Sequence, residues 1–327
     1  MADQPATTNS LSVLAWSERE GARRLPDLDA LRAAHADPAT WLWVDLREPT
    51  PDLLRAVTEL LGLHPLIVED IVERNQRAKI ELTDGTLHLV MFHLEHAGEL
   101  LSSEVDIVLT ERFLLTAHGS EVDLWRPGFL RRSAETYLGE GPDYLLWAIA
   151  DRLVDDYFPV FDKLADEIDG LEDDVMARPS PWLVERLFGV RRELLLIRHA
   201  VMPQREIFNQ LTNRDLDMIR RPRVIFFRDV YDHLIRLTDE LDSHRELVAA
   251  ALDIYLSQVN NNLSEVVKRL TVVTVILAGA GALAGIFGMS EVGLALSFAD
   301  LRFWLVAGGI VVLGAALLLW FRRTGWI

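Results

Sequence analysis

Apolar residues are distributed unevenly along the chain, and two long uncharged runs lie near its C-terminal end. Residues 270–289 and residues 303–321 contain no charged side chain. Each run has about 19–20 residues, the length that an α-helix needs to cross roughly 30 Å of hydrocarbon. Upstream of residue 270, charged residues are dense and no apolar run approaches this length. The pattern predicts a large soluble body on a hairpin of two transmembrane helices.

The N-terminal region, residues 1–140, mixes short apolar runs with turn signals. Helices are expected to begin near Pro51 and near Pro65, because proline favours the first turn of a helix. Short apolar runs bounded by turn residues indicate strands between and after these helices. The expected strands are residues 41–46, 87–93, 105–109 and 113–116. This region is therefore predicted to form an α/β domain.

Residues 141–222 have a helical period, with apolar residues four positions apart from residue 145 to residue 153. Residues 162–174 are rich in Asp and Glu, which is typical of the solvated face of a helix. Pro179 and Pro181 end this helix, and a second helix is expected to return antiparallel to it. We interpret the region as a pair of acidic antiparallel helices.

Residues 223–289 are predicted to form one stalk helix that continues into the first apolar run. The region contains no proline, and its apolar residues recur at spacings of three, four and seven. A helix of about 65 residues would be on the order of 100 Å long and hardly stable alone, so we expect it to pack against copies of itself. The seam consists of Val230, Leu234, Leu237, Leu241, Val248, Leu252, Tyr255 and Val259.

Basic residues flank the two apolar runs on the side of the soluble body. The loop at residues 290–302 instead carries Glu291, Asp300 and a single arginine, Arg302. Because cytoplasmic flanks of membrane helices are enriched in Lys and Arg, both termini are expected in the cytoplasm and the loop outside. The N-terminal residues resemble no secretory signal, so we expect a multi-pass protein of the cell (inner) membrane, with residues 303–327 forming the second span and a basic end. The basic flanking residues are Lys268, Arg269, Arg322 and Arg323.

Composition narrows the possible chemistry. The formal net charge is −17, which argues against nucleic acid as a partner because phosphate binding needs a positive surface. An acidic body attracts cations instead. The chain has no cysteine, so disulfides, thiolate metal sites and thiol catalysis are excluded.

The stalk seam continues into the first apolar run as a stripe of small or weakly polar residues. Small residues four apart, as at Gly281 and Gly285, let transmembrane helices pack closely. The same stripe could instead line the pore of a symmetric oligomer, with apolar constrictions at Val267 and Leu270. Spacing leaves both interpretations open. The stripe comprises Ser264, Val267, Leu270 or Thr271, Thr274, Ala278, Gly281, Gly285 and Gly288.

The glycines of this segment also permit a rival hypothesis of a different class. Residues 271–278 could be a buried strand, and residues 279–285 approximate the glycine turn of a dinucleotide-binding enzyme, with Asp300 about 20 residues further on. Only another apolar run follows Asp300, so a parallel sheet could not be completed. We therefore expect that the protein is not an enzyme.

Short motifs are distributed along the chain, among them Phe227-Arg228-Asp229-Val230-Tyr231-Asp232-His233. The other motifs are residues 63–66, 69–71, 76–79, 169–172, 261–271, 284–289 and 321–326. These segments resemble those of the CorA family of divalent metal-ion transporters. They occur in the family order and together extend over nearly the whole chain.

The resemblance implies a membrane protein of α+β class: a homopentameric funnel with a cytoplasmic α/β domain and a long stalk helix that lines a channel. Family members carry Mg²⁺, Co²⁺ or Ni²⁺, and Zn²⁺ in the ZntB-like branch. The implied partners are therefore the lipid bilayer, divalent cations and other copies of the chain. The implied alternatives are a transporter of Zn²⁺ or another cation, and a cation-sensing membrane scaffold that does not conduct.

The family marks its outer pore mouth with Gly-Met-Asn, and this chain departs from that motif. Gly288 and Met289 are followed by Ser290, whose hydroxyl is shorter than a carboxamide and both donates and accepts hydrogen bonds. A ring of serines would hold the waters around Mg²⁺ less selectively. Glu291 comes next, and a ring of carboxylates could restore the preference for cations.

The resemblance also implies a regulatory Mg²⁺ site. Asp229 matches a family aspartate that takes part in such a site between neighbouring cytoplasmic domains. Its partner comes from the α/β domain and matches no clear motif, and we take Glu95 as the hypothesis for it. His88, His93 and His96 raise the possibility of zinc binding. On a strand, however, His88 and His93 would point to opposite faces, because they are an odd number of residues apart.

Overall fold

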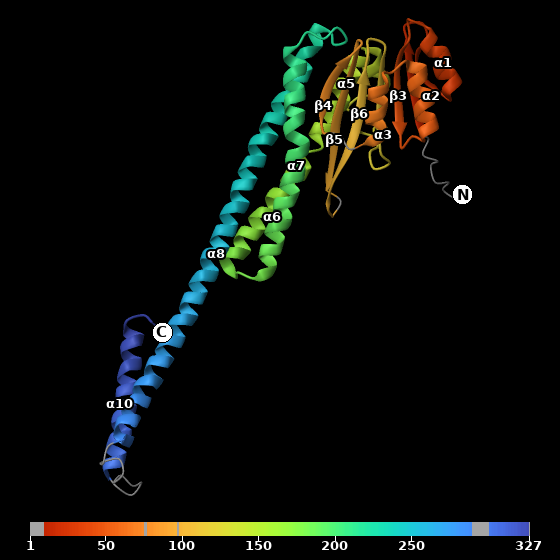
Figure 1. Cartoon of the computed structure of the whole chain (residues 1–327). Helices are drawn as coiled ribbons and strands as arrows, with labels where there is room; N and C mark the ends of the chain where they lie inside the picture. The colour runs from red at the N-terminus through yellow and green to blue at the C-terminus, as the bar shows by residue number, and fades with distance from the viewer. Residues whose placement is uncertain (1–9, 75–76, 97, 290–300, 327) are drawn as a thin grey trace, which may run out of the picture. The chain divides into compact units, whose positions relative to one another are not determined.

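The computed structural model describes residues 10–74, 77–96, 98–289 and 301–326. The chain divides into two compact units, Met1–Asp173 with Glu185–Ala249, and Asp174–Val184 with Ala250–Ile327. The first contains the α/β domain and the second contains the apolar helices (Figure 1).

The α/β domain is built on a seven-stranded sheet with the order β2-β1-β3-β7-β6-β5-β4. Strands β3 and β7 are parallel and every other neighbouring pair is antiparallel. Residues 41–46, 87–93, 105–109 and 113–116, expected as strands, all lie in strands. The strands are β1 (Leu11–Ser17), β2 (Gly21–Leu25), β3 (Trp41–Arg47), β4 (Lys79–Thr83), β5 (Thr86–His96), β6 (Leu100–Leu109) and β7 (Phe113–His118).

Helices cover both faces of this sheet (Figure 1). Thr50 caps the start of α2 by accepting the backbone N–H of Leu53, and Pro51 follows it, as the sequence pattern predicts. One face carries α1 (Leu28–Ala36), α2 (Pro51–Leu61) and α3 (Pro65–Glu73) over a core of alternate strand residues. The other face carries α4 (Ala134–Gly139) and α5 (Pro142–Asp155).

A buried polar network lies on the α5 face of the sheet. Asp45 is 2% exposed and accepts hydrogen bonds from Trp125 Nε1 at 2.9 Å, from the Thr116 hydroxyl, and from His118 Nε2 at 3.0 Å. His118 Nδ1 lies 2.9 Å from the Gly119 carbonyl oxygen. Burial lowers the pKa of His118, but the hydrogen bond and the charge of Asp45 outweigh it, so the net shift of the pKa is upward.

This upward shift predicts a pH dependence of stability. A raised folded-state pKa stabilises the fold fully below the unfolded value of 6.5, and the contribution is lost as pH rises through the folded value. The thermal midpoint of the full chain in detergent, followed by tryptophan fluorescence, should therefore decrease as the pH is raised from 6 to 8.5. The decrease should be roughly 2–4 °C for each kcal/mol of unfolding free energy that is lost. His118→Gln should flatten this dependence, whereas His199→Gln, at an exposed position, should preserve it. An equally steep fall in His118→Gln would contradict the assignment.

Further helices follow the α/β domain along the chain. Helix α6 (Phe158–Ala177) and helix α7 (Pro181–Asn213) are separated at Pro179 and Pro181, as expected. A short 3₁₀ turn, η1 (Arg221–Arg223), precedes α8 (Val224–Met289), which has 66 residues and agrees with the expected stalk helix. Helix α10 (Leu301–Arg323) includes the second apolar run.

The first part of the stalk seam is covered by the chain itself. Leu234, Leu237 and Leu241 are fully buried. Rings of α8 meet rings of α6 and α7 there: His244 lies 6.0 Å from Phe161, and Phe227 lies 6.4 Å from Phe208. The expectation that the whole seam packs against other copies is therefore wrong for residues 230–248. The periodicity identified a buried face, but it could not identify the helices that bury it.

Candidate permeation path and cation sites

Helix α8 supplies the candidate membrane span. Among the described residues, one helix is long and apolar enough to cross a membrane, over Arg221–Ile286. Its C-terminal part leaves large apolar side chains uncovered, with Val267 53%, Leu270 64% and Leu277 67% exposed. Such a surface is stable only when lipid or other helices cover it.

The C-terminal part of α8 has two distinct faces. The face that packs on α10 includes Val272, which is 1% exposed, and Ile276, whose Cγ2 lies 3.8 Å from the Cβ position of Gly314. The small stripe lies on the opposite side, because Thr274 and Ala278 are each two residues, or about 200°, further around the helix. Thr274, Ala278, Gly281 and Gly285 are all exposed.

Gly281 and Gly285 of the stripe meet no neighbour among the residues of their own chain that the structure describes. A Cβ added to either would find no atom within 4 Å. The described parts of α8 and α10 therefore do not use these two glycines for close packing with each other. The stripe is left for other copies of the chain or for a water-filled path.

Two threonines place hydroxyl groups along this part of α8. Thr274 Oγ1 donates to the Leu270 carbonyl at 2.8 Å, and Thr271 Oγ1 donates to the Val267 carbonyl at 2.8 Å. A hydroxyl that donates to its own helix still has lone pairs that can accept. These oxygens can therefore accept hydrogen bonds from the water molecules around a hydrated cation.

The expected basic flanks lie just before the apolar part of α8 and in the last turn of α10. Arg269 forms an ion pair with Glu265 one turn earlier on α8, and Lys268 is exposed beside it. Arg322 and Arg323 form the last turn of α10 and are exposed. Gly288 and Met289 end α8, whereas Ser290 and Glu291, the expected mouth residues, lie outside the described residues.

Asp229 lies in a cluster of titratable side chains on the first unit. One ligand atom each of Asp151, Asp229 and His233 lies within 4.8 Å of the others. Burial, and then the charge of neighbouring Asp155, raise the pKa of Asp151 to about 6. His233 Nδ1 is 3.7 Å from Asp155. Helix α5 supplies Asp151 and α8 supplies Asp229, so no spacing within one element could indicate this grouping.

Glu95 is exposed near the end of β5 and does not belong to this cluster within one chain. Its proposed pairing with Asp229 concerns two neighbouring subunits and stays a prediction. The nearby histidines have separate partners: His93 Nε2 lies 3.9 Å from Asp156, and His96 Nε2 lies 3.7 Å from Glu193. His88 contacts Asp106 instead, on the side of the sheet that α3 covers.

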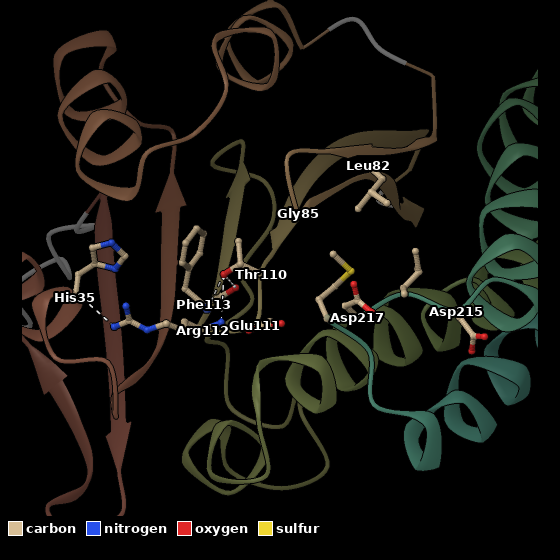
Figure 2. A pocket seen from close by; sticks show the side chains of 11 residues that line it. His35, Leu82, Gly85, Thr110, Glu111, Arg112, Phe113, Asp215 and Asp217 are labelled. Atoms are coloured by element: carbon tan, nitrogen blue, oxygen red, sulfur yellow. Dashed lines mark hydrogen bonds between the residues drawn. The ribbon is translucent and has the colours of Figure 1, made fainter.

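A pocket of 530 Å³ opens between the β6–β7 turn and the segment that follows α7 (Figure 2). Glu111, Asp215 and Asp217 contribute carboxylates to its lining. The Arg112 guanidinium donates to the backbone carbonyls of His35 at 2.9 Å and of Asp37 at 2.6 Å, so it is held by the fold. We assign this pocket no part in permeation.

Comparisons with known proteins decide the family. The model of the CorA-like Mg²⁺ transporter proteins matches residues 38–323. The chain belongs to this family. It is 35% identical over 260 residues to the cobalt/magnesium transport protein CorA of Thermotoga maritima, covering 78% of this chain and 74% of that protein. It is 25% identical over 292 residues to the cobalt/magnesium transport protein CorA of Methanocaldococcus jannaschii, covering 88% and 91%.

The fold agrees with a solved structure of the family. The complete structure of the CorA magnesium transporter from Methanocaldococcus jannaschii superposes with a TM-score of 0.80 at 22% identity, covering 96% of this chain and 98% of that one. The protein is thus a CorA-family divalent-cation transporter of the membrane, which confirms the expected class. The dinucleotide-binding hypothesis is excluded, because residues 271–285 are helical rather than a strand and a turn.

Proposed function

We propose that five copies of this chain form a channel that conducts divalent cations, Mg²⁺ above all, across the cell membrane. The observation that carries the proposal is the small stripe of α8, which lies opposite α10 and whose Gly281 and Gly285 meet no partner in the described part of the chain. Five such stripes around an axis would enclose a narrow path lined by hydroxyl and small side chains. Native mass spectrometry in mild detergent tests the assembly, and a protein found only as monomers or dimers would contradict it.

Both α8 and α10 cross the membrane in this proposal, with the two termini in the cytoplasm. The basic residues at the start of the first span and at the end of the second support this orientation. Cysteine introduced in the loop at residues 290–302 should react with an impermeant maleimide from outside intact cells. Cysteine introduced at Lys268 should not react from outside. The chain has no native cysteine, so only the introduced residue can be labelled.

The transported ion is tested by uptake into liposomes that contain the purified protein. We expect Mg²⁺ to be carried, with Co²⁺, Ni²⁺ and Zn²⁺ compared under the same gradient. Ser290 in place of the family asparagine favours weaker selectivity for Mg²⁺, so preferential Zn²⁺ uptake would support the second candidate function. Cation binding without uptake of any of the four ions would instead indicate a sensing scaffold.

The outer mouth provides a charge-specific prediction. If Glu291 attracts cations, Glu291→Gln should lower uptake by roughly two- to fivefold at low salt and less at physiological salt, where the Debye length is about 8 Å. Ser290→Asn should raise the preference for Mg²⁺ over the other ions. Unchanged uptake and ion preference in both variants would indicate that ions are selected deeper in the pore, at Thr271 and Thr274.

A further inference from the structure

A second group of potential metal ligands lies in the α/β domain. Ligand atoms of Asp70, Glu81 and His88 lie within 4.8 Å of one another. Glu81 on β4 is paired directly with His88 on β5, so their side chains leave the sheet on the same face. Asp70 on α3 reaches this pair from the helix layer, and its Oδ2 lies 3.8 Å from His88 Nδ1.

The imidazole of His88 is fixed by a carboxylate behind it. His88 is fully buried, and its Nε2 lies 2.9 Å from Asp106 Oδ1. Because a carboxylate accepts, this contact places a proton on Nε2 and leaves the lone pair of Nδ1 on the side of Asp70. A carboxylate behind the distal nitrogen of a histidine is the usual support of a metal-bound imidazole.

The other nitrogen of His88 is left unsatisfied in the part of the chain that the structure describes. Nδ1 is buried and, among the described residues, no donor or acceptor satisfies it. A buried polar atom left unsatisfied costs about 1–3 kcal/mol, so its retention needs an explanation. A cation bound between Nδ1 and the two carboxylates would supply one.

Lys79 now provides the positive charge of this cluster. Its Nζ lies 2.7 Å from Asp70 Oδ2 and 3.3 Å from Glu81 Oε1. The Lys79 ammonium could donate a hydrogen bond to the lone pair of Nδ1, but it donates to the carboxylates instead and leaves Nδ1 unsatisfied. A metal ion would therefore compete with Lys79 for the same two carboxylates.

We propose that Asp70, Glu81 and His88 bind a divalent transition-metal ion of the Zn²⁺ or Co²⁺ type, with Asp106 positioning the imidazole. One nitrogen and two oxygen ligands suit Zn²⁺, which takes His nitrogen and carboxylate oxygen at about 2.0–2.2 Å. Mg²⁺ prefers oxygen ligands and keeps its waters, so it should bind here poorly. The fourth position is left to a water molecule, and all four residues belong to the first unit.

Co²⁺ titration of the full-length protein in detergent tests the site. The protein is first stripped with a chelator and then kept in excess Mg²⁺, which occupies oxygen-only sites. Visible absorption of Co²⁺ then reports ligation by nitrogen at low coordination number, and Zn²⁺ should displace it. We expect one such Co²⁺ per chain, with affinity at least about tenfold weaker in Glu81→Gln, because one of three ligands is lost.

A matched control and a variant of the competing lysine make the result specific. The Glu81 side chain is 49% exposed, so its substitution should leave the fold intact. Glu73→Gln removes the same charge at an exposed position of α3 and should leave Co²⁺ affinity unchanged. Lys79→Gln should strengthen binding, since the competing ammonium is gone.

The opposite outcome is equally clear. A purely structural ion-pair cluster predicts that Lys79→Gln lowers the thermal midpoint and leaves Co²⁺ affinity as it was. Equal Co²⁺ spectra and affinities in the wild type, Glu81→Gln and His88→Gln would overturn the proposal. The readout is optical and independent of ion flux, so the site can fail while the transport function stands.

Discussion

Replacing Ala278 with leucine should reduce Mg²⁺ uptake into liposomes at least about tenfold, because five added isobutyl groups would narrow and dewet the proposed pore. Ala278 is exposed on the face of α8 that lies opposite α10. A larger side chain there should leave the packing of α8 on α10 undisturbed. Uptake is measured with a Mg²⁺-sensitive dye inside the liposomes, at matched protein content.

The matched control is the same substitution elsewhere on the same helix. Ala284 is also exposed, but it is six residues further on and about 120° away around the helix. Ala284→Leu should therefore retain most of the uptake. Uptake at the wild-type level in both variants would show that the stripe does not line the path. An equal loss of uptake in both, with unchanged assembly, would indicate that added bulk acts through packing between helices.

The α/β domain was predicted from sequence only in part, and the missing strands have physical reasons. Strand β2 has three exposed residues in its centre, so it carries no apolar run. Strand β4 is a short edge strand with charged residues, which the rule of alternating apolar residues does not detect. Asp84 and Gly85, both with positive φ, form a two-residue turn that could have revealed β4 and the pairing of Glu81 with His88.

For the stalk, the sequence predicts the helix but not the residues that pack against it. The spacing of its apolar residues predicted one long helix, and α8 has 66 residues. A helical seam specifies which face is buried and leaves its partner undefined. From Val230 to Val248, α6 and α7 cover the seam. The sequence predicts these two helices but does not predict how they pack on α8. Further on, Val259 is 42% exposed and Leu263 is 60% exposed, so partners from outside the chain are still required there.

The candidate sites also differ in how far the sequence predicts them, depending on whether their residues lie in one element or in several. The small stripe is a pattern within one helix, so its residues could be read from the sequence. The cluster around Asp229 joins α5 to α8, and the cluster around His88 joins α3 to a hairpin. Contacts of this kind depend on how elements pack, which a spacing rule within one element does not describe. The resemblance to the family identified Asp229, but only the structure placed Asp151 beside it.

Asp229→Asn should remove most of the protection that Mg²⁺ gives the first unit against protease. Burial, and then the charges of Asp155 and Asp229, raise the pKa of Asp151, and a bound cation would relieve the repulsion among these carboxylates. At about ten times its Kd, a cation that binds only the closed form lowers the open population about tenfold. Cleavage should therefore slow about tenfold with Mg²⁺ in the wild type and hardly at all in Asp229→Asn.

The controls separate a site within one chain from one shared by two subunits. Asp239→Asn removes the same charge from an exposed position of α8 and should keep the Mg²⁺ protection. Asp151→Asn should abolish it if the cluster of one chain holds the ion, whereas Glu95→Gln should abolish it if a neighbouring subunit completes the site. Protection that survives in Asp229→Asn would refute a regulatory role for this residue. Loss in both Asp151→Asn and Glu95→Gln would mean that the cation joins the two groups, and the closed state would then depend on assembly.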